Sequence, residues 1–147
     1  MPLEWARRVA ARIRGLPARP GGRRGIGHDW EREAERALVA ERYTILERNF
    51  RTRDGEIDLI AEDGGVLCFV EVKGRRSGAF GSPAEAVTLE KQRRIARAAQ
   101  VYLGRSRRSS RRMCRFDVVC VDARQGAPGT VTILRDAFRE PPPPRRD

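Results

Sequence analysis

The chain has 147 residues, of which 39% are hydrophobic and 35% charged, so it is long enough for one domain with a single hydrophobic core. No stretch approaches the roughly 18 consecutive apolar residues of a membrane-spanning helix, which excludes a protein built on such helices. The segment 1–24 is rich in Arg, Pro and Gly and lacks the apolar region of a secretory signal. We therefore expect a basic flexible N-terminal tail, a cytoplasmic protein and no membrane partner.

The charge of the chain indicates a polyanionic partner. There are 31 Lys and Arg residues against 20 Asp and Glu, a formal net charge of +11, and binding to phosphates releases counterions. The lysines are only two, Lys73 and Lys91. Because a buried lysine can shift its pKa and handle protons, whereas arginine stays charged, each lysine is a candidate functional residue. The three cysteines form no CxxC pair, which argues against a disulfide framework and a zinc site.

A helix is the first predicted element of the folded domain, which we place at 25–139. Asp29 is its expected N-cap, and the helix runs to about Glu41. Its apolar stripe comprises Trp30, Ala34, Ala37 and Leu38. Three strands follow, at 43–50, 56–62 and 66–73.

After the third strand, 74–81 is expected to be a loop. The segment Ser82-Pro83-Ala84-Glu85 has a capping-box pattern, and it predicts a second helix that breaks near Thr88 and ends near Leu103. The Arg-rich stretch 105–112 is a predicted loop. A strand at 115–122 and an edge strand at 130–135 complete the domain, and a Pro-rich tail covers 140–147. The order α-β-β-β-α-β, with a further β, predicts an α/β protein with a mixed β-sheet flanked by helices.

The two strands around Gly64-Gly65 contain the most informative pattern. A Gly-Gly pair is a favoured hairpin turn, and with this turn Asp58 lies directly opposite Glu71, and Glu56 opposite Lys73. The other face of the hairpin is apolar: Ile57, Leu59, Ala61, Cys68, Val70 and Val72. A slip of one residue would mix charged and apolar side chains on both faces, so the sequence predicts this register.

Two carboxylates held side by side on a strand pair repel each other. A divalent cation removes this conflict, because Mg²⁺ or Mn²⁺ is bound by one or two carboxylates with waters and substrate phosphates. Lys73 is placed to position or activate a water beside Asp58 and Glu71. An ordinary solvated hairpin face is the alternative. The paired register, the rare lysine and the basic excess favour the metal site.

Several residues near the hairpin are candidates for contact with phosphates. Arg75 and Arg76 directly follow Lys73 in a Gly-flanked segment, which favours such contact. Lys91 and Gln92 open the second helix, where phosphate contact and packing over the core are equally expected. Gln92 is also a candidate for a residue that holds the site residues in place without contacting the metal or the substrate itself.

Other charged residues have two equally weighted interpretations. Glu56 either tunes Lys73 or forms a surface ion pair. The run 105–112 is either a solvated loop or a nucleic-acid-binding one. The binding candidates in it are Arg107, Arg108 and Arg111. Asp117, between apolar residues, is expected to pair with Arg115.

The pattern Gly-Glu-Ile-Asp-Leu-Ile at 55–60 with Phe-Val-Glu-Val-Lys at 69–73 resembles the Asp…Glu-x-Lys core of the PD-(D/E)xK nuclease superfamily. The wider sequence is similar to one bacterial branch, the YraN-type family, which is related to archaeal Holliday-junction resolvases. The similarity runs from about Gly27 to Val121. Its further motifs are Glu31 with Ala34, the segment 48–51, Gly81-x-Pro83-x-Glu85-Ala86-Val87, Lys91 and the segment 115–119.

This resemblance implies a restriction-endonuclease-like fold, with Asp58 and Glu71 as metal ligands, Lys73 as the catalytic lysine and Glu31 as an accessory acid that reaches the same site. The sequence departs from the pattern at Trp30, where Gly is usual before the glutamate, and at position 57, where the superfamily has Pro and this chain has Ile. Neither change removes a ligand.

The expected function is that of an endonuclease dependent on Mg²⁺ or Mn²⁺ that hydrolyses phosphodiester bonds of DNA, with branched or damaged DNA as candidate substrates and a homodimer as a candidate assembly. One alternative is a nucleic-acid-binding module of the same fold without catalysis. Another is a basic accessory protein that binds RNA or ribosomes. Aromatic residues are only 6% of the chain and scattered, which disfavours RNA recognition by stacking.

Overall fold

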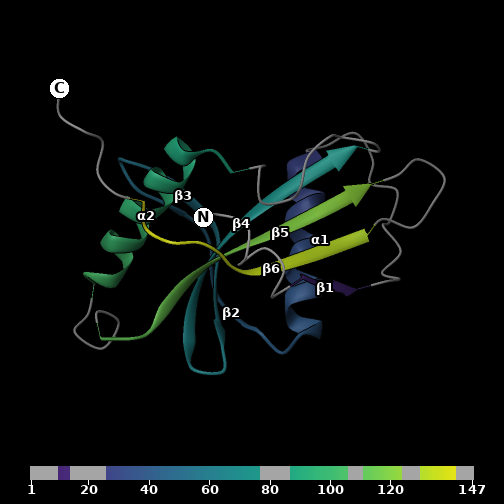
Figure 1. Ribbon diagram of the computed structural model, residues 1–147, viewed down its shortest axis with the longest axis horizontal. Helices are drawn as coiled ribbons and strands as arrows, with labels where there is room; N and C mark the ends of the chain where they lie inside the picture. Colours follow the sequence, from purple (N-terminus) through teal and green to yellow (C-terminus); the bar gives the residue numbers. More distant parts are fainter. Residues whose placement is uncertain (1–9, 14–25, 77–86, 106–110, 124–129, 142–147) are drawn as a thin grey trace.

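In the computed structural model, which describes residues 10–13, 26–76, 87–105, 111–123 and 130–141, two helices pack on a mixed β-sheet (Figure 1). The elements, in chain order, are β1 (Ala10–Ile13), α1 (Ile26–Ala40), β2 (Thr44–Arg51), β3 (Glu56–Asp63), β4 (Val66–Arg76), α2 (Leu89–Leu103), β5 (Cys114–Ala123) and β6 (Thr130–Phe138). The strand order across the sheet is β1-β6-β5-β4-β3-β2, and only β4 and β5 run parallel. No helix within the described ranges is long and apolar enough to cross a membrane.

The two helices cover opposite faces of the sheet. Neighbouring residues of one strand belong to different apolar clusters: Phe69 packs on the α2 side, whereas Val70 packs on the α1 side. The same alternation separates Val118 from Val119 on β5. The inner strands are therefore buried on both faces, as expected for strands with helices above and below them.

The mixed α/β class is confirmed, but the exact order of elements differs from the expected one, because β1 precedes α1. Residues 10–13 fall in the segment expected to be a flexible tail, and the structure pairs them antiparallel with β6, from Ala10 opposite Leu134 to Ile13 opposite Val131. The five longer strands, β2 to β6, form the body of the sheet, and β6 is not its edge. A four-residue strand carries little periodicity, and it exists here because β6 offers it unpaired backbone groups.

The helix boundaries agree in part with those expected. α1 begins at Ile26, about one turn before Asp29, so Asp29 lies in its first turn rather than at its N-cap. For α2, the capping-box residues 82–85 lie outside the described part of the chain. The expected break near Thr88 is described only on its C-terminal side: the Thr88 hydroxyl accepts a hydrogen bond of 3.2 Å from the backbone N–H of Lys91 and caps α2, which begins at Leu89 and ends at Leu103 as expected.

The segment after Lys73 is not a loop at its start. β4 continues to Arg76, because Gly74, Arg75 and Arg76 pair in parallel with residues 121–123 of β5. Gly74 is required by its surroundings: a Cβ atom there would lie 1.7 Å from Cε3 of Trp30, whose ring covers this point of the strand. The absence of a side chain at Gly74 therefore makes room for the bulky residue at position 30.

The register of the β3–β4 hairpin is as predicted over the five pairs next to the turn, but Asp58 and Glu71, expected directly opposite each other, are not among the paired residues. The pairs run from Asp63 with Val66 to Leu59 with Val70, and both turn glycines have positive φ, 56° at Gly64 and 86° at Gly65. The predicted apolar face is correct except at one residue. Ile57 belongs instead to the cluster on the α2 side of the sheet. Its backbone partner on β2, Phe50, belongs to the same cluster.

A buried polar network holds the sheet together near the hairpin turn. Asp117 has no exposed surface; it accepts hydrogen bonds of 2.9 Å from Tyr43 Oη, from Arg115 Nε and from the backbone N–H of Asp136. Arg115 also contacts Asp63, at the end of β3. The expected pairing of Asp117 with Arg115 is confirmed. Both oxygens of Asp117 are satisfied, so this network stabilises the fold and leaves no group for chemistry.

Candidate active site

The candidate site lies where β3 and β4 separate. The last backbone pair between them is Leu59 with Val70, and the next residue of β3, Asp58, places its side chain between the strands. Asp58 Oδ2 accepts a hydrogen bond of 2.8 Å from the backbone N–H of Val72. The carboxylate thus replaces a backbone carbonyl as the partner of a β4 donor, and this contact fixes its position.

Glu71 lies beside Asp58 and is almost completely enclosed. Only 4% of its surface is exposed, and its Oε2 atom is buried without a hydrogen-bond partner among the described residues. Its Oε1 atom is 3.5 Å from Nζ of Lys91, which reaches it from the first turn of α2. An unpaired buried acceptor costs about 1–3 kcal/mol, so Glu71 Oε2 is the atom of the site that most favours a proton or a cation beside it.

The two carboxyl groups are coupled. Burial and, after it, the neighbouring Asp58 charge together raise the pKa of Glu71 to about 8, against the opposing effects of Lys91 and Lys73. Burial also raises the pKa of Asp58, while the Val72 N–H opposes that rise. Without a cation the pair therefore retains a proton at neutral pH, because both groups cannot ionise at low cost in a buried place.

The residues present fit a divalent metal ion. Mg²⁺ is typically held by one or two protein carboxylates and completes its shell with waters and substrate oxygens. Asp58 and Glu71 supply such a pair, and Glu71 Oε2 has no competing partner in the described part of the molecule. Among the described residues no group of three or more His, Cys, Asp or Glu side chains that could hold a metal is found, so the structure does not add Glu31 to the pair.

Lys73 and Glu31 occupy different surroundings. Lys73 is half-buried, two residues beyond Glu71 on the same strand, and its charge lowers the pKa of Glu71, so the two side chains interact as the sequence predicts. Glu31 is partly buried and directly follows Trp30, whose ring covers Gly74 at the end of β4. The first turns of α1 thus lie over the strand just beyond Lys73. The accessory role of Glu31 remains a prediction.

Glu56 and Gln92 have structural partners. Glu56 is not brought opposite Lys73, because the β3–β4 pairing ends at Leu59 with Val70. It pairs instead with Arg51 of β2, with 3.7 Å between Glu56 Oε2 and Arg51 Nε, which agrees with the surface ion pair. Gln92 Nε2 donates a hydrogen bond of 3.0 Å to the carbonyl of Val87. This contact fixes the segment that enters α2, and the supporting role of Gln92 at the site stays a prediction.

The predicted phosphate-binding arginines are only partly described. Arg75 and Arg76 lie in β4, but their side chains are outside the described part of the structure, as are Arg107 and Arg108. Arg111 is exposed. Two other arginines of the run have structural contacts: Arg105 lies 4.5 Å from the centre of the Phe50 ring, and Arg112 pairs with Glu62 at 2.6 Å. Arg105 and Arg112 therefore have partners within the protein itself.

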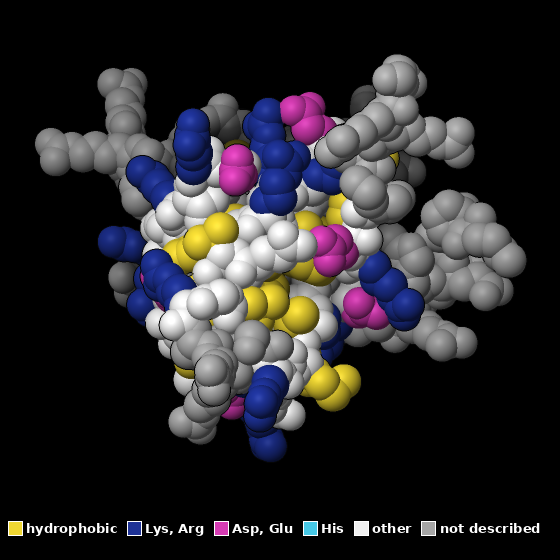
Figure 2. All heavy atoms as spheres, turned by 90° about the vertical axis from the view of Figure 1, so that its left-hand side faces the viewer, with side chains coloured by type: hydrophobic (Ala, Val, Ile, Leu, Met, Phe, Trp, Pro, Cys, Tyr) yellow, Lys and Arg dark blue, Asp and Glu magenta, His cyan; other side chains and the backbone are white. Residues whose placement is uncertain are grey.

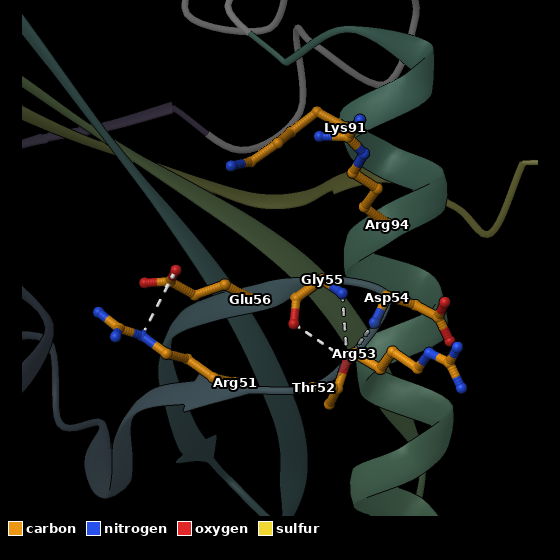
Figure 3. A pocket seen from close by; sticks show the side chains of 8 residues that line it. All are labelled: Arg51, Thr52, Arg53, Asp54, Gly55, Glu56, Lys91 and Arg94. Atoms are coloured by element: carbon orange, nitrogen blue, oxygen red, sulfur yellow. Dashed lines mark hydrogen bonds and ion pairs between the residues drawn. The ribbon is translucent and has the colours of Figure 1, made fainter.

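A basic pocket next to the carboxylate pair was missed by the sequence interpretation. It has a volume of about 530 Å³ and lies between the β2–β3 turn and α2 (Figure 3). Its lining residues are Arg51, Thr52, Arg53, Asp54, Gly55, Glu56, Lys91 and Arg94. We call it the β2–β3 pocket. The short polar segment between two strands predicts a turn, but no local pattern shows that this turn contacts a helix that begins more than thirty residues later.

Basic side chains are not confined to that pocket. Figure 2, which views the molecule from its α2 side, shows Lys and Arg side chains distributed around this face, with Asp and Glu between them and hydrophobic side chains nearer its middle. The positive charge is therefore spread over several elements rather than gathered on one helix. Such a distribution suits contacts with an extended polyanion.

The fold and the site define a mixed α/β protein with two neighbouring carboxylates, Glu71 buried and Asp58 half-buried, at the point where two strands separate. The model of the uncharacterised protein family UPF0102 matches residues 30–121, and the chain belongs to this family. The match includes Asp58, Glu71 and Lys73.

Relatives from several organisms share most of the chain. A UPF0102 protein of Symbiobacterium thermophilum is 50% identical over 115 residues, which cover 78% of this chain and 97% of the relative. A UPF0102 protein of Desulfosudis oleivorans is 48% identical over 116 residues, covering 79% and 91%. A third, from Rhodococcus opacus, is 46% identical over 113 residues, covering 77% and 95%. The site therefore lies in the part of the chain that these proteins share.

The raised pKa of Glu71 predicts a pH-dependent stability. The unfolded chain loses this proton near 4.5 and the folded chain near 8, so between these values the folded state holds the additional proton. The free energy of unfolding should fall as pH rises through this window, by at most about 1.4 kcal/mol per pH unit from this group. Glu71→Gln removes the effect, so the variant should gain stability relative to wild type from pH 4.5 to 8 and no further above it.

Urea denaturation at a series of pH values, without divalent metal, measures this difference. If wild type and Glu71→Gln lose stability in parallel over the whole range, Glu71 does not hold a proton in the folded state.

Proposed function

We propose that the protein is a metal-dependent endonuclease with a restriction-endonuclease-like fold, which hydrolyses phosphodiester bonds of DNA. The observation that carries the proposal is Glu71 Oε2, a buried carboxylate oxygen without a hydrogen-bond partner in the described structure, beside Asp58 and on the strand that also carries Lys73. The resemblance of this strand pair to the PD-(D/E)xK core supports it. So does the net charge of +11, which favours a polyanionic substrate.

In this proposal Asp58 and Glu71 hold Mg²⁺ or Mn²⁺. When bound, such an ion acidifies a water and neutralises charge on a phosphate under attack. The Val72 N–H keeps Asp58 in place, so this ligand needs little reorganisation when the cation arrives. Loss of the shared proton from Glu71 accompanies cation binding. Lys73 Nζ donates a hydrogen bond to the attacking water or to a phosphate oxygen, and so orients it.

The direct test is cleavage of linear, flapped and four-way DNA by the purified protein with Mg²⁺ or Mn²⁺, in parallel with a binding titration of each substrate. The proposal predicts metal-dependent nicking or cleavage of at least one of them. If the protein binds all three and cuts none with either metal, it is a nucleic-acid-binding module that has the fold without the activity.

Binding itself should depend strongly on salt and only weakly on sequence. If roughly six phosphates are contacted, the slope of log affinity against log salt should be near −5 on duplex DNA. Fluorescence anisotropy at several salt concentrations, with two unrelated duplexes, measures both properties. A flat slope would contradict the assignment of the arginines to backbone contacts.

A further inference from the structure

The β2–β3 pocket is built on a rigid frame. The Thr52 hydroxyl closes the turn through hydrogen bonds with the backbone N–H groups of Asp54 and Gly55, at 3.2 and 3.1 Å. Gly55 then lies directly on α2, where a Cβ atom would be 2.5 Å from the carbonyl oxygen of Arg94. This close backbone contact sets the distance between the turn and the helix. The backbone of the turn is therefore held against α2.

The charge of the pocket favours an anion. Four of its eight lining residues are cationic and two are acidic. Arg94 forms an ion pair with Glu90 on its own helix, at 2.7 Å, but both side chains are more than half exposed, so the pair is weak. Among the described residues Arg53 has no carboxylate partner. Arg51 pairs with Glu56 at 3.7 Å, and Lys91 pairs with Glu71 at 3.5 Å. The unneutralised positive charge of the pocket is therefore that of Arg53 together with the weakly paired Arg94.

The pocket adjoins the carboxylate pair through one residue. Figure 3 shows Lys91 extending from α2 over the side of the pocket formed by Arg51 and Glu56. The Lys91 ammonium that lines the pocket is also 3.5 Å from Glu71 Oε1. A ligand in the pocket and a ligand at the carboxylates therefore share a cation and lie next to each other.

The lining residues also indicate which part of a nucleic acid is bound. None of the eight is aromatic or aliphatic, so the pocket lacks the aromatic rings on which bases usually stack. Arginine side chains with a lysine are, by contrast, the usual partners of phosphate oxygens.

We infer that the β2–β3 pocket binds a backbone phosphate of a nucleic acid strand, next to the phosphate that lies at Asp58 and Glu71. This inference rests on the proposed function, and it adds a second phosphate-binding subsite next to the one at Asp58 and Glu71. The pocket recognises the phosphodiester backbone and not the bases, and it holds the strand across the end of α2. Lys91 connects the two subsites, because its ammonium group serves both.

The test is the double variant Arg51→Gln/Arg94→Gln. Both side chains are more than half exposed, so the variant should fold with an unchanged melting temperature. The matched control is Arg32→Gln/Arg36→Gln, which removes two exposed arginines from α1, on the opposite face of the sheet. Both proteins have the same net charge.

Duplex binding is measured by anisotropy without metal, so that catalysis does not enter. The pocket variant should bind about tenfold more weakly than the control at low salt, and its log–log salt slope should be smaller by about 1, since one phosphate contact is lost. Equal affinity and equal slope in the two variants would overturn the inference. Single variants at Arg51 and Arg94 give the same comparison if the double variant melts early.

Two further results separate the possible sources of phosphate. Inorganic phosphate and a mononucleotide, each compared with chloride at the same ionic strength, should not displace DNA from wild type. Specific displacement from wild type but not from the pocket variant would show a site for free phosphate, and would overturn the assignment to a nucleic acid strand.

The binding and cleavage experiments together distinguish failure of the subsite inference from failure of the proposed function. If wild type cuts no DNA but the pocket variant loses affinity and slope, the phosphate subsite stands and the catalytic proposal fails. If wild type cuts DNA and the pocket variant binds like the control, the catalytic proposal stands and the subsite inference fails.

Discussion

Replacement of Asp58 by Asn, of Glu71 by Gln or of Lys73 by Ala is expected to reduce metal-dependent cleavage by at least about a hundredfold, the lower end of the range for loss of a group that acts on the reacting water. Affinity for duplex DNA should remain. One charge among so many is a small part of the electrostatic attraction. Asp58→Asn removes the carboxylate that is ionised while Glu71 holds the proton, so its affinity should rise slightly at low salt, and the gain should shrink as salt increases. Glu71→Gln replaces a group that is mostly protonated at neutral pH, so its affinity should stay close to that of wild type.

Asp58→Asn is the most informative of the three, since the asparagine carbonyl can still accept the hydrogen bond from the Val72 N–H. Loss of activity would then reflect the missing charge and not a disturbed strand. Glu62→Gln is the control: it removes a carboxylate from the same strand, near the hairpin turn, where its partner is Arg112. Unchanged cleavage by Lys73→Ala would show that the lysine has no part in the reaction, or that a contaminant performs it.

Gly74→Ala is expected to destabilise the protein by about 1–3 kcal/mol or more, the usual cost of forcing additional atoms into a filled space. The new Cβ atom would lie 1.7 Å from the Trp30 ring, so either α1 or β4 must move. Because the obstacle is a side chain, Trp30→Ala in the same protein should recover much of the loss. The free energy of unfolding of the four proteins of this cycle, measured with urea, gives the coupling.

Two other glycines provide comparisons. Gly104→Ala should be nearly neutral, because the nearest atom to its Cβ would be 3.4 Å away and its φ of −70° suits any residue. Gly55→Ala should be destabilising whatever residue occupies position 30, since its obstacle is the backbone oxygen of Arg94. If Trp30→Ala fails to relieve Gly74→Ala, the ring does not lie over Gly74.

The hairpin could be predicted in detail from the sequence, whereas its surroundings could not. Alternation of apolar and charged residues around Gly64-Gly65 permits one register, and this register brings Asp58 toward Glu71. The sequence could not show that Asp58 enters the space between the strands, because that depends on where the β3–β4 pairing stops. The burial of Glu71 likewise depends on α2, which contributes Lys91 from a distant part of the chain.

Contacts between elements account for the other differences. Strand β1 forms only because β6 presents an open edge to it. The extension of β4 to Arg76 follows from pairing with β5, which overrides the local preference of Gly74 for a loop. The β2–β3 pocket combines arginines of a turn with a helix that touches the turn through Gly55. None of these contacts leaves a periodic signal in the sequence, since periodicity reports only which face of one element is buried.

The hydrogen bond between Asp58 and the Val72 N–H gives the two carboxylates different evolutionary constraints. Position 58 serves the backbone as well as the chemistry, so a family member that has lost cleavage would still need an acceptor there, and Asp or Asn would persist. Position 71 has no such duty toward the backbone: Oε1 of Glu71 pairs with the Lys91 ammonium, and Oε2 has no hydrogen-bond partner within the described structure. In a descendant that only binds nucleic acid, an apolar residue should replace this glutamate early. The residue at 71, and not the one at 58, should therefore distinguish cutting members of the family from members that only bind.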